Sequence, residues 1–134
     1  MITSQSNSNA PCVALITCSS KKEAEDLSAT LIKRKQAACV NIFPVESGNS
    51  PVQLISVYQW DNTIQQDAEI LLVVKTTINH LTAIEDILNK MHSYDVPELI
   101  ALPIIGGSKA YLDWLQNTVA ETPEDMLPKG NILE

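Results

Sequence analysis

Two long extended segments near the middle of the chain limit the folds that this sequence can adopt. They cover residues 52–60 and 64–76, and the short turn Asp61, Asn62, Thr63 joins them, so they predict a β-hairpin. The arms are about nine and about thirteen residues long, whereas a typical strand has roughly five or six. The distal half of such a hairpin has no partner inside a small domain, and its exposed edges favour association with other copies. The hairpin therefore predicts a symmetric oligomer.

The segments on either side of the hairpin alternate between strand and helix patterns. Ser20 and Glu23 form an S-x-x-E capping box that opens a helix after the first strand. In chain order, the predicted elements are a strand at 12–17, a helix to about residue 34, a strand at 36–44, the hairpin, a helix at 79–91, a strand at 99–102 and a helix from 108. This order predicts the α+β class, with a ferredoxin-like split βαβ sandwich that carries a long β-hairpin and an added C-terminal helix.

One domain accounts for most of the chain. Of the 134 residues, 45% are hydrophobic, which suits a single core within residues 12–119. Residues 1–11 are polar and low in complexity, so we expect a disordered N-terminal segment. Residues 120–134 are rich in proline and charge and are expected to form a C-terminal tail.

The charge of the chain restricts the classes of partner that it can bind, and its cysteine content indicates the cellular compartment. The formal net charge of -7 argues against binding to nucleic acid or to an anionic membrane, since phosphate groups are bound by clustered Lys and Arg. No apolar run approaches the length of a membrane span. Cys12, Cys18 and Cys39 are odd in number and form no C-x-x-C pair, so we expect reduced thiols and a cytoplasmic location.

The stretch HSYDVPELIALP, residues 92–103, holds most of the chemically distinctive side chains of the second half of the chain. Pro97 keeps the residue before it out of the helical region, so the preceding helix must end and a strand must begin. The apolar run that follows predicts a short strand buried on both faces, in the centre of the sheet. His92, Tyr94 and Glu98 then gather at the loop that leads into this strand, where binding residues are common.

Five short segments carry a resemblance to a known family. They are QAACVNIFP, YQW in the hairpin, VVKTT, HSYDVPELIALP and YLDWL. With them the chain closely resembles the CutA divalent-cation-tolerance family from Cys12 to about Val119. The resemblance implies a ferredoxin-like subunit assembled as a compact homotrimer through strand pairing between subunits, in agreement with the long hairpin. It also implies a cytoplasmic bacterial protein, copper binding as in some members, and a role in tolerance of divalent metal ions.

Residue by residue, the resemblance points to His92 as a contact for Cu(II). His92 matches the histidine of the family pattern H-x-Y-x-x-P-E, in which Tyr94, Pro97 and Glu98 are also in place. Cys39 matches the cysteine of the family's A-A-C-V. Tyr94 and Glu98 are therefore expected to support a site built around His92.

Two positions depart from the pattern of the metal-binding members. Where some members have a cysteine and a second histidine, this chain has Ile16 and Met91. Cys18 lies two residues beyond Ile16 on the same face of the strand and becomes a further candidate. Imidazole suits Cu(II) and zinc, and thiolate selects Cu(I), so His92, Cys39 and Cys18 are the candidate metal ligands.

Each candidate also has a structural interpretation. His92 could cap the helix that it ends by hydrogen bonding to the backbone. Cys39 could be a small buried hydrophobic residue inside a strand. His80, near the start of the second helix, is expected to be solvated.

Charged residues of the hairpin suggest a cleft between subunits. Asp67, Glu69 and Lys75 share one face of the second arm, where they could line such a cleft or form a solvated face. Aromatic residues are the candidates for packing against a neighbouring subunit. The candidates for this trimer interface are Tyr58, Trp60 and Trp114.

Three classes of function follow. The resemblance and the chemistry of His92 favour a non-enzymatic homotrimer that binds copper or another divalent metal ion in metal homeostasis. The alternative is a signalling trimer similar to the PII proteins, which bind small anionic ligands in clefts between subunits, but the chain has no Gly-rich phosphate loop and few basic residues. An enzyme ranks last, because no set of nucleophile, base and orienting residue can be assembled.

Overall fold

The computed structural model describes residues 8–45 and 54–120. The elements are β1 (Pro11–Cys18), α1 (Lys21–Lys33), β2 (Cys39–Phe43), β3 (Leu54–Trp60), β4 (Thr63–Thr77), a 3-10 turn (Ile78–His80), α2 (Leu81–Met91), β5 (Ile100–Pro103) and α3 (Lys109–Thr118). The predicted α+β class and the ferredoxin-like arrangement are confirmed. The disorder predicted for residues 1–7, the start of the hairpin at 52–53 and the tail at 121–134 lie outside the described residues.

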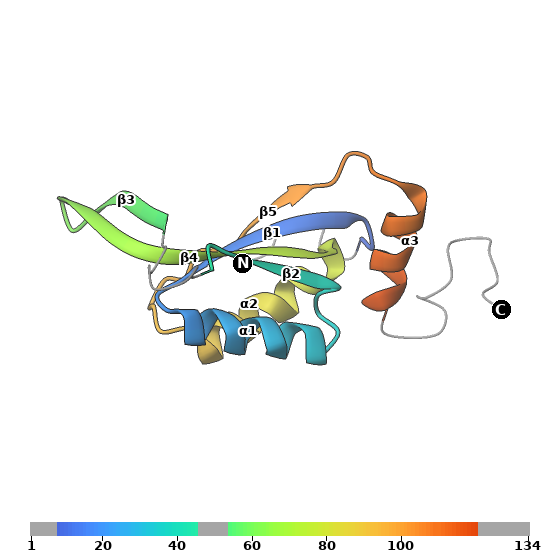
Figure 1. The fold of residues 1–134 in the computed structure, drawn as a ribbon, viewed down its shortest axis with the longest axis horizontal. Coiled ribbons are helices and arrows are strands. Elements are labelled where there is room, and N and C mark those ends of the chain that lie inside the picture. Colours follow the sequence, from blue (N-terminus) through green and yellow to red (C-terminus); the bar gives the residue numbers. More distant parts are fainter. Residues whose placement is uncertain (1–7, 46–53, 121–134) are drawn as a thin grey trace.

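A single antiparallel sheet organises the described residues. Its strands follow the order β2-β4-β1-β5, and β3 pairs with the first half of β4. Leu54 lies opposite Glu69 and Trp60 opposite Thr63, so the hairpin is confirmed. The turn between the arms has positive φ angles of 54° and 59°, at Asp61 and Asn62, as in the two-residue turns that match strand twist. Figure 1 shows the hairpin extending beyond the helices at one end of the sheet, with α3 at the other.

The core lies between one face of the sheet and two helices. Alternate residues of β1 and β4 point to this side and are buried, together with the apolar stripes of α1 and α2. The main contributors are Cys12, Ala14, Ile16, Cys18, Leu72 and Val74 from the strands, and Leu27, Leu31, Ile84 and Leu88 from the helices. Figure 1 shows α1 and α2 side by side along this face. We call it the helix-covered face.

The opposite side of the sheet is also apolar, but much less of it is buried. Val13 and Leu15 of β1 and Leu71 and Val73 of β4 are half-buried, and residues of β5 lie beside them in register. We call this side the open face. A single chain therefore leaves a continuous apolar surface on one side of its sheet.

The position of β5 corrects one prediction. A strand buried on both faces in the centre of the sheet was expected, but β5 is an edge strand that pairs only with β1. Ile100 and Leu102 are 51% and 53% exposed. The prediction was wrong because a run of apolar residues shows only that a strand tends to be buried. It does not show whether the same chain or another molecule covers the strand.

Two further predictions are wrong for local reasons. Residues 8–11 were expected to be disordered, but the backbone N–H of Ile78 donates to the carbonyl oxygen of Ala10 at 3.0 Å, and Asn79 donates to that of Ser8 at 2.7 Å. His80 was expected to be solvated, but it is only 1% exposed. The 3-10 turn directs its ring inward, where Nδ1 lies 2.6 Å from Oε1 of Gln36. No helix in residues 8–45 or 54–120 is long and apolar enough to span a membrane.

Candidate functional site

Three segments meet where β1 ends, α1 begins and α2 ends. Cys18 is the last residue of β1, Glu23 lies in the first turn of α1, and His92 follows the last residue of α2. Their ligand atoms lie within 4.8 Å of one another, and they are the only such group of three metal-binding side chains in the described residues. We call these three residues the helix-end cluster.

His92 is held through both nitrogens of its ring. Nε2 lies 2.7 Å from the carbonyl oxygen of Thr17, so this nitrogen carries the proton and donates it. Nδ1 accepts a hydrogen bond of 3.1 Å from the backbone N–H of Tyr94 and lies 4.0 Å from Oε2 of Glu23. The backbone N–H of His92 donates to the carbonyl of Leu88, so the residue also caps α2, as its structural interpretation expected.

Glu23 ties the start of α1 to the residue after His92. Its Oε1 accepts from the backbone N–H of Ser19 at 3.0 Å, and its Oε2 accepts from that of Ser93 at 2.7 Å. Burial alone would raise the pKa of Glu23, but the hydrogen bonds from Ser19 and Ser93 lower it below its ordinary value. The predicted capping box is present on one side, because the N–H of Glu23 donates to Oγ of Ser20 at 3.1 Å. On the other side the carboxylate binds Ser19, not Ser20.

The donor set of the helix-end cluster fits copper or zinc. Thiol, imidazole and carboxylate are the ligand types of these ions. Because Nε2 of His92 donates to a backbone carbonyl, Nδ1 is the unprotonated nitrogen, as is usual for a metal-binding histidine, and in this structure its lone pair accepts from the backbone N–H of Tyr94, with Oε2 of Glu23 4.0 Å away. Burial, followed by the carboxylates of Glu23 and Glu69, raises the pKa of the Cys18 thiol to about 12. A metal ion bound here would therefore have to displace a thiol proton.

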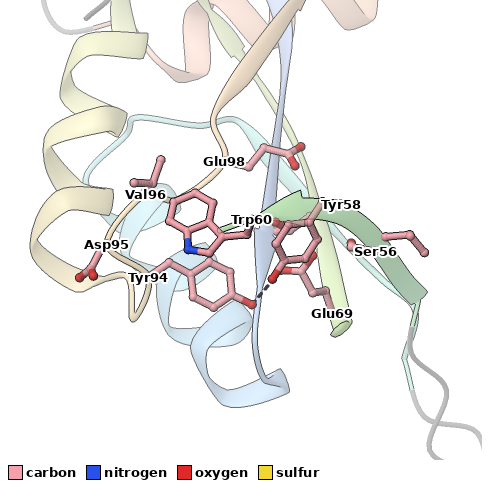
Figure 2. Close-up of a pocket in the computed structure, with 10 residues that line it drawn as sticks. Ser56, Tyr58, Trp60, Glu69, Tyr94, Asp95, Val96 and Glu98 are labelled. Carbon is pink, nitrogen blue, oxygen red and sulfur yellow. Dashed lines mark hydrogen bonds between the residues drawn. The ribbon is translucent and has the colours of Figure 1, made fainter. Parts of the chain in front are cut away.

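A cavity of about 570 Å³ lies at the root of the β3–β4 hairpin. Figure 2 shows that the hairpin and the loop before β5 both contribute side chains to it. The hairpin supplies Ser56, Val57, Tyr58, Trp60 and Glu69, the loop supplies Tyr94, Asp95, Val96 and Glu98, and β1 supplies Thr17. We call it the acidic cavity, because three of these ten residues carry carboxylates and none is basic.

Tyr94 connects the two sites. Its hydroxyl donates to Oε2 of Glu69 at 2.8 Å, the bond drawn as a dashed line in Figure 2. Its ring lies 4.7 Å, centre to centre, from the ring of His92. Burial and the hydrogen bond to Glu69 raise the pKa of Tyr94, so the hydroxyl keeps its proton and remains the donor. A change at His92 is thus felt directly by a residue that lines the acidic cavity.

The matching family model is described as the CutA1 divalent ion tolerance protein, and it covers residues 12–118. The chain belongs to this family. A chloroplastic CutA 1 protein of Oryza sativa is 42% identical over 110 residues, which are 82% of this chain and 58% of the relative. The divalent-cation tolerance protein CutA of Thermus thermophilus is 39% identical over 104 residues, which are 78% of this chain and 93% of the relative. The chain thus spans less than two thirds of the rice protein and nearly all of the bacterial one.

The fold is shared with solved CutA1 structures. The crystal structure of CutA1 from Oryza sativa aligns with a TM-score of 0.75 and 41% identity, over 85% of this chain and 98% of that one. The Thermus thermophilus structure aligns with a TM-score of 0.71 and 39% identity, over 78% and 94%. The predicted membership of the CutA family is confirmed.

Within this CutA1 family chain, the predicted metal ligands do not all meet. His92 and Cys18 lie together, but Cys39 is opposite Lys75 in the sheet, on the open face, whereas Cys18 is opposite Ile70 on the helix-covered face. Cys39 instead contacts Tyr111 of α3. A single subunit therefore cannot use Cys39 and His92 as ligands of one ion.

The predicted cleft residues also separate into two groups. Glu69, Tyr94 and Glu98 line the acidic cavity, and Asp67 accepts a hydrogen bond from Tyr58 beside it. Lys75 donates to Asn41 instead, and it lies six residues from Glu69 along β4, roughly 20 Å away.

Sequence reasoning missed Glu23 as part of the site. It was assigned only to the capping box. A local signal was present, because Glu23 follows Cys18, the last residue of β1, by five residues, and this short connection keeps its carboxylate near the Cys18 thiol. What the chain order could not supply was the meeting of Glu23 with His92, which lies 69 residues further along the sequence.

Proposed function

We propose that this CutA1 family member is a non-enzymatic homotrimer that binds a divalent metal ion, copper or zinc, as part of metal tolerance. The observation that carries the proposal is the helix-end cluster, in which a thiol, a carboxylate and an imidazole lie within 4.8 Å of one another. In the described residues no other group of three such side chains converges in this way.

Each residue of the helix-end cluster has a defined part in holding the ion. Nδ1 of His92 would bind it while the carbonyl of Thr17 keeps the ring in place. Cys18 and Glu23 would supply the anionic ligands, and the bound ion would offset their buried negative charge. Binding at Nδ1 replaces the hydrogen bond from the backbone of Tyr94, so the loop that starts there has to shift.

The apolar open face supports assembly. Ile100 and Leu102 extend this face to the edge of the sheet and are half exposed in one chain, so burial against another copy would remove their apolar surface from water. The edge of β5 and the protruding hairpin offer unpaired backbone groups to other copies. The number three follows the family resemblance, and light scattering tests it: a mass three times that of the chain is expected, and a monomer at micromolar concentration would contradict assembly.

A calorimetric titration with Zn(II), which does not oxidise thiols, tests the metal site, with Cu(II) titrated in parallel. We expect saturable binding near one ion per subunit, loss of that binding in His92→Ala, and weaker binding in Glu23→Gln. Affinity should rise with pH, because the thiol of Cys18, with its pKa raised to about 12, must lose its proton.

Glu25→Gln is the matched control for Glu23→Gln, since Glu25 is an exposed carboxylate on the same helix outside the cluster. It should bind metal as the unchanged protein does. Weak, non-stoichiometric binding that is indifferent to both His92→Ala and Glu23→Gln would contradict the metal site.

A second candidate function is a signalling trimer, similar to the PII proteins, that binds a small ligand in clefts between subunits. The acidic cavity favours a small-ligand site, because it lies beside the exposed hairpin and is large enough for a small molecule. Its three carboxylates and the absence of a basic residue from its lining suit a cation and not the anionic ligands of the PII proteins. A cytoplasmic location is part of both proposals. It rests on the three free thiols Cys12, Cys18 and Cys39.

A further inference from the structure

The acidic cavity combines negative charge with aromatic surface. Of the ten residues that line it, three are acidic, three are aromatic and none is basic. Figure 2 shows the rings of Tyr58, Trp60 and Tyr94 around the space, with the carboxylates of Glu69 and Glu98 beside them, while Asp95 points away. The ligand that suits this lining is positive and has apolar surface of its own.

Glu69 is the most constrained of these carboxylates. It is only 6% exposed, and the hydroxyl of Tyr94, which donates to it, is a neutral partner. Burial and the nearby carboxylate of Glu69 raise the pKa of Glu98. Negative charge in a partly buried space without a basic partner is costly, and a bound cation would reduce that cost.

The spacing of the carboxylates argues against a single metal ion as that cation. A metal ion needs three or more donor atoms close around it, and among the described residues only the helix-end cluster provides three donors within 4.8 Å. An organic cation spreads its charge and its contacts over a larger volume. Its ammonium group is also attracted by the faces of Trp and Tyr rings.

We infer that the acidic cavity binds a small organic cation of the ammonium class. Glu69 and Glu98 face its charge, and Trp60, Tyr58 and Tyr94 contact its apolar body. The inference rests on the second candidate function, because it names the class of ligand that such a cleft would take. Its variants are distinct from those of the metal site, since Glu69 and Trp60 lie outside the helix-end cluster, and Tyr94 is the residue through which the two sites touch.

Benzylammonium and benzyl alcohol are matched probes, because they have nearly the same shape and only the first is charged. They are titrated into the full-length protein, with Trp60 fluorescence as the readout in a Trp114→Phe background that leaves Trp60 as the sole tryptophan. We expect benzylammonium to bind at least about tenfold more tightly than benzyl alcohol, as one charge-assisted contact provides. Glu69→Gln, which keeps the hydrogen bond from Tyr94, should abolish that difference, and Trp60→Leu, followed by calorimetry, should weaken benzylammonium binding.

Control variants separate this inference from the proposed function. Glu25→Gln, at an exposed carboxylate of α1 outside both sites, should leave benzylammonium binding unchanged. Equal affinities for the two probes, or tighter binding of benzoate, would overturn the cation class while leaving a ligand-binding cleft in place. Failure of every probe to saturate at millimolar concentration would overturn the inference together with the second candidate function, whatever the result of the metal titration.

Discussion

The two faces of the sheet are built from the same strands but reach different degrees of burial. Along β4, Leu72 and Val74 are fully buried under α1 and α2, whereas their neighbours Leu71 and Val73, on the open face, remain half-buried. Both sets are aliphatic, so composition does not explain the difference. The helices α1 and α2 cover one face, and the proposed assembly would cover the other.

The difference also organises the functional residues. The helix-end cluster is formed where β1, α1 and α2 meet, so Cys18 and His92 are placed by the packing of the core. The acidic cavity lies on the open side, with Glu69 and Trp60 supplied by a hairpin that extends past the helices (Figure 1). The metal site should therefore depend on the fold of one chain, and the cavity also on assembly.

The largest expected effect is a loss of stability that differs between Leu72, on the helix-covered face, and its neighbour Leu71, on the open face. Leu72→Ala should lower the free energy of unfolding by about 3 kcal/mol at any protein concentration, because it leaves a cavity in a closed core. Leu71→Ala should destabilise the protein by weakening assembly, so the loss in the free energy of unfolding should become smaller as the protein is diluted. Urea unfolding of both variants over a range of protein concentrations measures this, and equal losses that do not depend on concentration would show that both faces are closed within one chain.

The next effect concerns the open face at the edge of the sheet. Leu102→Lys places a charge beside Val13 and should weaken assembly by about 2 kcal/mol, roughly thirtyfold in the dissociation constant, without unfolding the subunit. Ile105→Lys is the matched control, since Ile105 is 99% exposed and follows the end of β5. Sedimentation velocity measures both variants, and the same oligomer distribution for each would exclude the open face from the interface.

A smaller effect is expected further along the same side, on the hairpin. Trp60 lies opposite Thr63, so it continues the open face along β3, and it is 57% exposed. If Trp60 is an interface anchor, Trp60→Ala should weaken assembly by about 1.5 kcal/mol. Ile55→Ala, on the other side of the same strand, is the control, and unchanged dissociation in Trp60→Ala would rule out this role for Trp60.

What the sequence could predict about the fold follows from local patterns. The hairpin was readable because its turn and both arms are contiguous, and α1 because Ser20 and Glu23 lie three residues apart. The grouping of Tyr94 with Glu98 followed for the same reason, since Pro97 fixes the loop that holds both. These features depend on a few neighbouring residues. The structure contains the hairpin and α1, and it places Tyr94 and Glu98 on the lining of the same cavity.

What the sequence could not predict depends on long-range register. Cys39 faces away from Cys18 because it pairs with Lys75, and a shift of one residue would place it on the other face. The exposure of β5 and the burial of His80 depend in the same way on partners distant in sequence, namely β1 and Gln36. Such pairings decide which candidate ligands lie together, which explains why only two of the three predicted ligands meet.

The smallest expected effect is the pH dependence of the link that Glu23 makes between α1 and the loop after α2. The pKa of Glu23 is lowered in the folded protein, so its ionised form adds stability above the unfolded-state value of about 4.3. That stability is lost as pH falls through the lower folded-state pKa. Glu23→Gln should therefore be about 1 kcal/mol less stable than the unchanged protein at neutral pH, as for the loss of a helix cap, with a difference that disappears in acid. Thermal unfolding at several pH values, with Glu25→Gln as the exposed control, measures it. If the difference in stability disappears in acid, the charge of Glu23 is what holds the start of α1 to Ser93 and keeps the helix-end cluster together. If the difference stays constant at pH values well below the ordinary glutamate pKa, the charge of Glu23 does not contribute, and the prediction is contradicted.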